Sequence, residues 1–444
     1  MKRILILGAG LSSSSLIKYL LDHSEEQDWK VAICDASLEL AKRKAANHPR
    51  SEVFYFDVYN EEQRKSEISK SDIVISMLPA RMHHLVAVDC VKNGVNMVTA
   101  SYVSNEIKAL DKEAKEKGVL LLNEIGVDPG IDHMSAMQII DRIKENGGKI
   151  INFESSTGGL VAPEYDNNPW NYKFTWNPRN VILAGQGVSQ FLHNGKFKYI
   201  PYRKLFSRTE DVEILDLGAF EIYPNRDSLK YREVYGLENI RTMFRGTIRR
   251  KGFSEAWNVF VQLGLTDDTF IIDDSSSITY REFIDRFLPN NSRLSTESIL
   301  AKVLKIEVES EIMEKIIWTG IFEDKVVGLD KATPAQILQH LLEPKLVLGP
   351  EDRDMIVMYH LFDYEFQNEI KRITSTMVTK GTDQVHTAMS ITVGIPVAIA
   401  TKLILTEKIK LKGVQVPIVK EIYEPVLKEL DSFGIKFIEQ EISN

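Results

Sequence analysis

Apolar positions in the first part of the chain follow two alternating patterns. Short, predominantly apolar runs, such as residues 4–7, 30–34, 73–77 and 119–122, are typical of strands that are buried on both faces of a sheet. The segments between these runs carry apolar residues at helical spacing. Strands and helices that alternate in this way predict a doubly wound parallel sheet with helices on both faces.

From residue 151 the pattern changes. Strand-like segments, including residues 181–183 and 213–217, are mixed with polar and aromatic loops, which predicts an antiparallel α+β domain. Residues 293–370 are interpreted as helical and charged. Residues 387–405 are apolar but interrupted by Gly394 and Pro396, so we expect a buried helix whose small residues allow close packing, and not a membrane span.

The first apolar run ends in a glycine turn that carries candidate chemistry. Gly8-Ala9-Gly10 leads into a helix, and the next strand ends on Asp35, which is the layout of a dinucleotide-binding βαβ unit. Gly8 permits the tight turn, and Gly10 lets the backbone approach a pyrophosphate at the helix N-terminus. Ser13 replaces the third glycine of the fingerprint but is still small. A bare Gly-x-Gly also occurs in ordinary turns, and its context here favours nucleotide binding.

In a doubly wound sheet the ligand crosses the carboxyl ends of the strands. The residues at such ends are Asp57, Ser76, Leu78, Pro79, Ser101 and Tyr102. The sixth strand leads into a Gly-Val-Asp-Pro-Gly turn at residues 126–130. Asp128 precedes a proline and is therefore held extended, where its carboxylate would face the nicotinamide end of a cofactor. The alternative is that Asp128 only stabilises the turn, because Asp-Pro-Gly is common turn chemistry.

Composition narrows the class of protein. The 444 residues are 43% hydrophobic and 27% charged, as in an ordinary globular chain, and the net charge of −8 argues against a nucleic-acid partner. The two cysteines, Cys34 and Cys90, fall in strand and helix patterns and suit a reducing cytoplasm. The nine histidines are scattered, and no spacing suggests metal ligands. We therefore expect no metal site and no membrane association.

Several loops of the second part join glycine or proline to arginine, asparagine or aromatic residues, notably residues 173–179, 223–228 and 244–249. A guanidinium group pairs bidentately with a carboxylate, so these loops suit a substrate that carries carboxylates. Any single arginine can instead form a surface ion pair.

Taken together, these motifs resemble the saccharopine dehydrogenase (saccharopine reductase, glutamate-forming) family. The segments that carry the resemblance are residues 8–10, 101–103, 126–133, 158–164, 223–228, 244–247, 387–389 and 392–394. The resemblance implies a Rossmann doubly wound parallel sheet interrupted by an α+β substrate-binding domain. Its implied divisions are an NAD(P)-binding domain at 1–126, a substrate-binding and catalytic domain at 127–384, and a segment at 385–444 that returns to the Rossmann domain.

The implied function is that of an oxidoreductase of lysine metabolism, which oxidises L-saccharopine reversibly to L-glutamate and 2-aminoadipate 6-semialdehyde with NAD(P). The resemblance places the substrate on Ser101, Tyr102, Val127, Asp128, Arg226, Thr247 and Ile248. It places the cofactor on Gly8, Gly10, Leu11, Ser12, Ser13, Asp35, Asp57, Val58, Ser76, Leu78, Pro79 and Trp176. Asp128 and Tyr102 are the candidates for proton transfer, and the assignment between them stays open. We expect a cytoplasmic homodimer.

The choice of cofactor depends on Asp35. A carboxylate at the end of the second strand accepts hydrogen bonds from both ribose hydroxyls of NAD and repels the 2′-phosphate of NADP, so we expect NAD, although many glutamate-forming members use NADP. The nearest cations, Lys42, Arg43 and Lys44, lie at least a helical turn further on. They favour NADP only if the helix brings one of them back.

Two alternative functions need separate consideration. A carboxynorspermidine or homospermidine-type dehydrogenase of the same superfamily would act on a substrate with more amines, for which acidic residues would be expected in place of Arg226. A non-catalytic nucleotide sensor would keep the cofactor site and lose the chemistry, which the presence of Asp128, Tyr102 and Arg226 disfavours.

Overall fold

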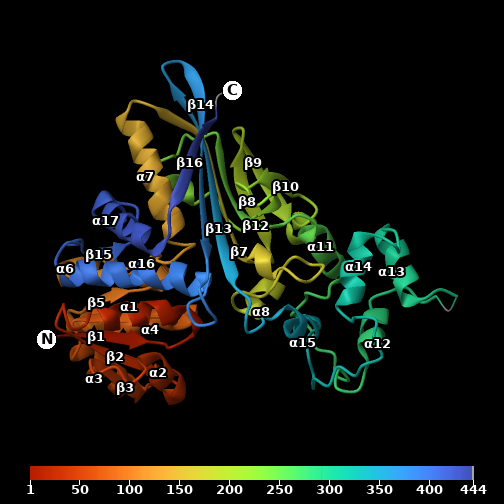
Figure 1. Ribbon diagram of the computed structural model, residues 1–444, viewed down its shortest axis with the longest axis horizontal. Coiled ribbons are helices and arrows are strands. Elements are labelled where there is room, and N and C mark those ends of the chain that lie inside the picture. Colours follow the sequence, from red (N-terminus) through yellow and green to blue (C-terminus); the bar gives the residue numbers. More distant parts are fainter. Residues whose placement is uncertain (292, 443–444) are drawn as a thin grey trace. The chain divides into compact units, whose positions relative to one another are not determined.

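The computed structural model describes residues 1–291 and 293–442. The chain forms two compact units. The first unit contains residues 1–150, 364–369 and 377–438, and the second contains residues 151–363, 370–376 and those from 439 on. The chain thus returns to the first unit after building most of the second, which confirms the predicted Rossmann fold interrupted by an α+β domain (Figure 1).

The first unit contains a seven-stranded sheet in which every neighbouring pair is parallel. Its order is β15-β6-β5-β4-β1-β2-β3. The strands are β1 (Lys2–Leu7), β2 (Trp29–Asp35), β3 (Ser51–Tyr55), β4 (Ile73–Ser76), β5 (Asn96–Val98), β6 (Leu120–Leu122) and β15 (Gly413–Gln415). The chain reverses its direction of travel across the sheet between β1 and β4, which is where ligands bind in open parallel sheets.

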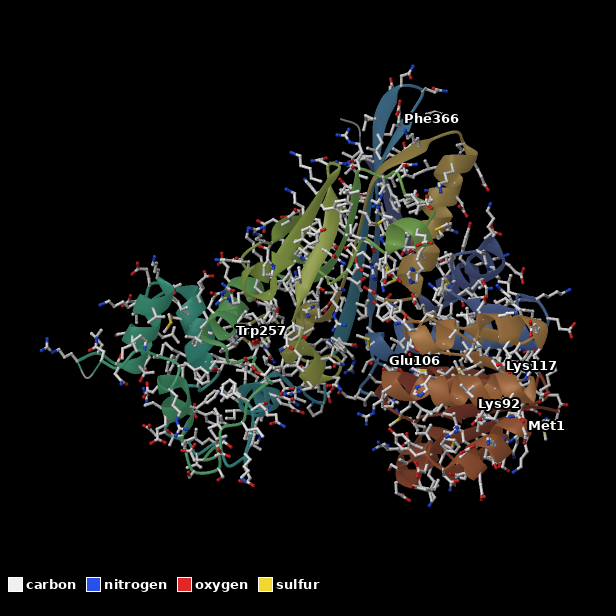
Figure 2. All side chains as sticks on the ribbon, turned by 180° about the vertical axis from the view of Figure 1, so that it is seen from behind. Met1, Lys92, Glu106, Lys117, Trp257 and Phe366 are labelled. Carbon is white, nitrogen blue, oxygen red and sulfur yellow. The ribbon has the colours of Figure 1, made fainter. Side chains whose placement is uncertain are left out.

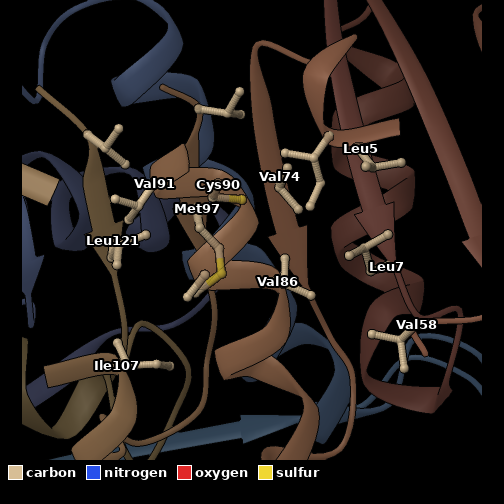
Figure 3. Packing of buried hydrophobic residues seen from close by; sticks show 14 of the residues in the cluster. Leu5, Leu7, Val58, Val74, Val86, Cys90, Val91, Met97, Ile107 and Leu121 are labelled. Carbon is tan, nitrogen blue, oxygen red and sulfur yellow. The ribbon is translucent and has the colours of Figure 1, made fainter. Parts of the chain in front are cut away.

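The helices of the first unit surround this sheet. They are η1 (Leu11–Ser13), α1 (Ser14–Asp22), α2 (Leu38–Ala45), α3 (Glu61–Ser69), η2 (Ala80–Met82), α4 (His83–Asn93), α5 (Asn105–Lys108), α6 (Asp111–Glu116), α7 (Ile131–Glu145), α16 (Ala388–Leu405), α17 (Lys420–Leu430) and η4 (Asp431–Phe433). On one face of the sheet, Leu5, Val74 and Met97 pack against Val86 and Cys90 of α4 (Figure 3). Charged side chains such as those of Lys92, Glu106 and Lys117 are exposed around this core (Figure 2).

Helix α16 lies alongside α1 (Figure 1). Among the described residues it is the one helix long and apolar enough to cross a membrane by length and composition, yet 78% of that span is buried inside the protein. The approach to α1 is close at Gly394, where an added Cβ would lie 2.9 Å from the Leu16 backbone nitrogen and 3.0 Å from the Ser12 carbonyl oxygen. The close packing next to the glycine turn therefore depends on a glycine that is distant in sequence.

Gly394→Val is expected to destabilise the first unit. The extra methyl groups must displace the backbone of α1, and overpacking of this kind costs about 1–3 kcal/mol in a well-packed core. Thermal unfolding followed by circular dichroism should show a lower Tm for Gly394→Val and a smaller decrease for Gly394→Ala. An unchanged Tm for both variants would show that the two helices can separate without cost.

The second unit is built on a nine-stranded sheet. Its main path is β10-β11-β12-β7-β13-β14-β16, and β8 pairs with β12 and β9. The strands are β7 (Lys149–Val161), β8 (Val188–His193), β9 (Lys196–Pro201), β10 (Glu210–Glu213), β11 (Ala219–Pro224), β12 (Thr242–Arg250), β13 (Asp354–Phe366), β14 (Glu369–Lys380) and β16 (Phe437–Ile442). The predicted antiparallel pairing holds for β10–β11, β11–β12 and β8–β9, but β12 runs parallel to β7, so the sheet is mixed.

The remaining helices of this unit are η3 (Pro163–Tyr165), α8 (Pro178–Ile182), α9 (Tyr202–Leu205), α10 (Tyr231–Val234), α11 (Phe253–Leu263), α12 (Tyr280–Asp285), α13 (Thr296–Leu304), α14 (Glu311–Trp318) and α15 (Pro334–Leu346). Three sequence interpretations were wrong here, in whole or in part. Residues 181–183 belong to the end of helix α8, which Asn177 caps through its side chain. Residues 214–217 follow the end of β10 and form no strand. The helical interpretation of 293–370 is confirmed at α13, α14 and α15 and is wrong at β13, where β-branched and aromatic residues form a long strand.

Candidate functional site

The glycine turn between β1 and η1 has the geometry that the sequence suggests. Gly8 adopts a φ of +106°, and a Cβ there would lie 2.8 Å from the Met77 carbonyl oxygen, so no other residue fits without strain. Ser13 is buried, and its hydroxyl donates to the Gly10 carbonyl oxygen at 2.8 Å, closing the turn. The Ser15 N–H at the start of α1 already donates to the Ser390 hydroxyl at 3.0 Å, so a phosphate would have to be bound by N–H groups that precede it in the turn.

Asp35 ends β2 and is bound to this turn. One carboxylate oxygen accepts a hydrogen bond from the Ala9 backbone N–H at 2.7 Å, and the other accepts from the Ser37 N–H at 2.8 Å. Each oxygen keeps a further lone pair, and the side chain is only partly buried. Asp35 can therefore hold the turn and still accept from ribose hydroxyls.

One of the cations on α2 does return to the nucleotide turn. The Lys44 ammonium donates a hydrogen bond to the Ser14 hydroxyl at the start of α1. Burial, and to a lesser extent the nearby charge of Arg43, lowers the pKa of Lys44 below its ordinary value. A cation can favour NADP only if α2 brings it back toward the nucleotide turn, and Lys44 partly meets this condition through its contact with Ser14.

Most of the other predicted cofactor residues lie at or after the carboxyl ends of strands in the same unit, except Leu11 and Ser12, which are in η1, and Trp176, which is in the second unit. Asp57 is half-buried and accepts from the Tyr59 N–H at 2.9 Å, which holds the β3 end in a tight turn. Leu11 and Pro79 are exposed, whereas Ser12 and Leu78 are partly covered and Val58 and Ser76 are buried. The exposed and partly covered members are the ones that can contact a dinucleotide with their side chains.

A histidine that the sequence reasoning missed joins two of the predicted residues. The His83 Nδ1 lies 2.8 Å from the Ser76 hydroxyl, and its Nε2 lies 2.7 Å from the Ser101 hydroxyl. His83 is only 2% exposed, and burial, with a smaller contribution from the charge of His84, lowers its pKa to about 4. The position of His83, seven residues after the end of β4 and at the start of α4, is a signal that the sequence carries, but the spacing expected of metal ligands does not reveal it.

The two candidates for proton transfer lie together in the first unit. The Tyr102 hydroxyl donates to an Asp128 carboxylate oxygen at 3.3 Å. Tyr102 is 42% exposed and Asp128 is half-buried before a cis Asp128–Pro129 bond, while the neighbouring Val127 is buried. A carboxylate and a phenol held in contact can bind one proton between them and exchange it with a ligand.

In the second unit, Thr247 and Ile248 lie on opposite faces of β12. Thr247 is half-buried and stands directly opposite Tyr223 on β11 and Thr157 on β7. Ile248 is fully buried on the other face, so only its backbone can contact a ligand that the Thr247 side chain touches. The two predicted residues therefore cannot act through their side chains on one ligand.

Arg226 follows the end of β11 in a left-handed conformation with φ of +34°. Its carbonyl oxygen accepts from the Gln190 N–H at 2.7 Å, which holds the backbone in place. The side chain is exposed, and within residues 1–291 and 293–442 the structure shows no carboxylate paired with it.

Trp176, the predicted cofactor residue of the second unit, is 38% exposed and lies just before the N-terminus of α8.

The arginines of the 244–249 stretch are not surface residues. Arg245 and Arg249 flank Thr247 on the same face of β12 and are only 5% and 3% exposed. The Arg245 guanidinium lies 4.2 Å from the centroid of the Tyr231 ring. The Arg249 guanidinium is surrounded by aromatic rings, including that of Tyr172 at 5.0 Å. Both charges are thus stabilised by aromatic faces.

Across the described part of the chain, no cluster of His, Cys, Asp or Glu could hold a metal ion.

The glycine turn, the acid at the end of β2 and the polar strand ends define the first unit as a dinucleotide-binding Rossmann fold. Family models agree with this class. Residues 4–122 match the saccharopine dehydrogenase NADP binding domain, and residues 126–435 match the saccharopine dehydrogenase C-terminal domain. The chain belongs to the saccharopine dehydrogenase family, which confirms the resemblance found in the sequence.

Individual relatives extend this result. The chain is 33% identical to the mitochondrial alpha-aminoadipic semialdehyde synthase of Rattus norvegicus, over 98% of this chain and 47% of that protein. It is 32% identical to saccharopine dehydrogenase [NADP(+), L-glutamate-forming] of Saccharomyces cerevisiae, over the full length of both chains. The apo structure of the L-Glu forming enzyme from Saccharomyces cerevisiae superposes with a TM-score of 0.91 at 31% identity, covering 100% of both chains. The chain thus spans about half the length of the first relatives and all of the yeast enzyme, and these matches favour neither alternative function.

Proposed function

We propose that this protein is an oxidoreductase of lysine metabolism that interconverts L-saccharopine with L-glutamate and 2-aminoadipate 6-semialdehyde. The observation that carries the proposal is the Tyr102–Asp128 pair in a dinucleotide-binding unit. The full-length similarity to the yeast L-glutamate-forming enzyme supports the choice of substrate.

The reaction requires a hydride acceptor and proton transfers at two stages. A nicotinamide cofactor bound at the glycine turn and the strand ends would supply the acceptor for the hydride of the carbon next to the secondary amine. A protein group must take the proton that the amine loses. When water adds to the resulting imine and the carbon–nitrogen bond breaks, a protein group must also accept a proton from the water and return one to the leaving amine. Asp128 and Tyr102 form the pair proposed for these transfers, because a carboxylate accepts a proton readily and the phenol in contact with it can relay one.

Substrate binding is assigned to Ser101, Tyr102, Val127, Asp128, Arg226, Thr247 and Ile248. Saccharopine carries three carboxylates, and the exposed Arg226 guanidinium, which pairs with no carboxylate among the described residues, is suited to bind one. The Ile248 contribution is a backbone one, since its side chain is buried on the far face of β12. The cofactor residues are those of the glycine turn and the strand ends, together with Trp176. We propose NAD as the preferred cofactor, although the yeast relative is named for NADP(+).

The proposal is tested by following reduced-nicotinamide absorbance with saccharopine as substrate and NAD or NADP as oxidant. A saccharopine-dependent rise, with glutamate as the product, is the expected result. Carboxynorspermidine supplied in the same assay should give no rise. Activity with the polyamine and none with saccharopine would favour the alternative substrate, whereas cofactor binding without turnover would favour the nucleotide sensor.

Arg226→Ala is expected to raise the KM for saccharopine, or to lower kcat/KM, by roughly ten- to a hundred-fold, because removing a charged hydrogen-bond partner costs about 1.5–3 kcal/mol. Cofactor affinity, measured by fluorescence titration, should not change. Arg203→Ala is the matched control, since Arg203 is also an exposed arginine of the second unit. Equal kinetics for wild type and Arg226→Ala would remove the carboxylate contact from the proposal.

Three further parts of the proposal concern the whole protein. We propose the divisions at 1–126, 127–384 and 385–444 as functional segments, a homodimer as the assembly, and the cytoplasm as the location. The buried, unpaired thiols of Cys34 and Cys90 suit a reducing compartment. Light scattering of the purified protein at several concentrations tests the assembly, and a mass of one chain would exclude the dimer.

A further inference from the structure

The buried His83 connects two residues that have separate assignments. Ser76 is a proposed cofactor residue and Ser101 a proposed substrate residue, and the imidazole bridges their hydroxyls at 2.8 and 2.7 Å. All three belong to the first unit. At neutral pH the imidazole carries one N–H and one lone pair, since its pKa of about 4 keeps it uncharged. One of the serines must then donate to it, and the other must accept from it.

The burial of Ser76 decides between the two arrangements. Ser76 is fully buried, so its proposed contact with the cofactor is a backbone one, and its hydroxyl has no other hydrogen-bond partner among the residues that the structure describes. If His83 carried its proton on Nδ1, the Ser76 hydroxyl would accept and its own hydrogen would be buried without an acceptor. If the proton is on Nε2, the Ser76 hydroxyl donates to Nδ1 and the His83 N–H donates to Ser101, so that both buried donors have an acceptor.

The second arrangement determines what Ser101 can do. With the proton on Nε2, the Ser101 hydroxyl oxygen accepts from His83 and its hydrogen is directed elsewhere. The Ser101 backbone is held as well, because its N–H donates to the Thr99 hydroxyl at 3.3 Å and its carbonyl accepts from the Glu124 N–H at 3.0 Å. Ser101 is only partly buried, so the free hydrogen can reach a ligand.

We propose that His83 is a positioning residue that fixes the Ser101 hydroxyl as a hydrogen-bond donor toward a carboxylate of the substrate. This inference rests on the proposed function for the nature of the substrate. The Ser76 hydroxyl is the anchor that selects the tautomer. The chain of Ser76, His83 and Ser101 thereby links the end of β4 to the segment that follows β5.

A double-mutant cycle tests the coupling. Ser101→Ala is expected to raise the KM for saccharopine about ten-fold with a smaller change in kcat, because a hydroxyl that donates to a carboxylate is removed. His83→Phe should raise the KM by a similar factor, and the double variant should be no worse than either single one. His83→Gln, which can accept and donate, should recover most of the loss. Two results would overturn the proposal. One is a KM of the double variant that is raised by the product of the two single-variant factors, and the other is an equal rise in KM for His83→Gln and His83→Phe.

A structural control and a second readout keep the test independent of folding and of the substrate. His84→Phe changes the neighbouring, half-buried histidine of α4 and should leave the KM within two-fold. Long-range ¹H–¹⁵N NMR of the full chain, with the signal assigned by its loss in His83→Gln, should show the proton of His83 on Nε2. A proton on Nδ1 would overturn the inference even if the enzyme oxidises saccharopine. A proton on Nε2 in a protein without saccharopine activity would instead locate the failure in the proposed function.

Discussion

Asp128→Asn is expected to lower kcat for saccharopine oxidation by roughly 10²–10⁴-fold, the range that a positioned general acid or base supplies. Asparagine keeps the size of the side chain and can still accept from the Tyr102 hydroxyl, which lies 3.3 Å from the carboxylate, but it cannot take a proton. The affinity for reduced cofactor should stay within a few-fold of wild type. The measurements are kcat by initial rates and cofactor affinity by fluorescence titration.

Tyr102→Phe separates the roles of the pair. If Asp128 is the base and Tyr102 orients it, the phenylalanine variant loses less activity than Asp128→Asn and keeps the wild-type pH dependence. If the phenol itself transfers the proton, the loss is as large and the pH dependence changes. Glu106→Gln, which neutralises an exposed carboxylate of the same unit, is the control for the change in charge. An Asp128→Asn enzyme with wild-type kcat would show that Asp128 only stabilises its turn.

Asp35→Ser is expected to shift the ratio of kcat/KM for NAD over NADP toward NADP by roughly a hundred-fold. In wild type the Asp35 carboxylate would face the 2′-phosphate of NADP, and two like unit charges at 4 Å repel by about 4 kcal/mol at an effective dielectric near 20, before screening reduces the effect. Serine removes this repulsion and keeps a hydroxyl that can accept from the Ala9 N–H. Steady-state kinetics with both cofactors give the ratio.

Lys44 provides the companion experiment. Its ammonium contacts Ser14 near the nucleotide turn, so any residual use of NADP by wild type should decrease in Lys44→Ala, with little effect on NAD. Lys42→Ala is the matched control, because Lys42 is on the same helix but is exposed and paired with Glu39. A wild-type preference for NADP, or an unchanged ratio of kcat/KM for the two cofactors in Asp35→Ser, would show that Asp35 does not select the cofactor. Its role would then be only the hydrogen bond that connects β2 to the glycine turn.

The first unit was predictable because its signals are local. Most strands from β1 to β6 contain an apolar run, and a run buried on both faces, as in β1 and β4, needs no partner in sequence to be recognised. The exception is β3, whose residues are half-buried or exposed. The Gly8 turn and the Asp35 position follow from backbone geometry within one βαβ unit, where the spacing of residues leaves few alternatives. The second unit lacks such signals. In β13 the apolar residues have helix-compatible spacing, and only pairing within the mixed sheet decides in favour of the strand.

By itself, the sequence determined the class of the fold, the glycine turn, the acid at the end of β2 and the likeness to the family. Only the tertiary structure decided which residues meet. It brought Gly394 against α1, placed His83 between Ser76 and Ser101, and returned Lys44 to the start of α1. Contacts of this kind depend on the packing of segments distant in the chain, and no local preference for helix, strand or turn encodes them.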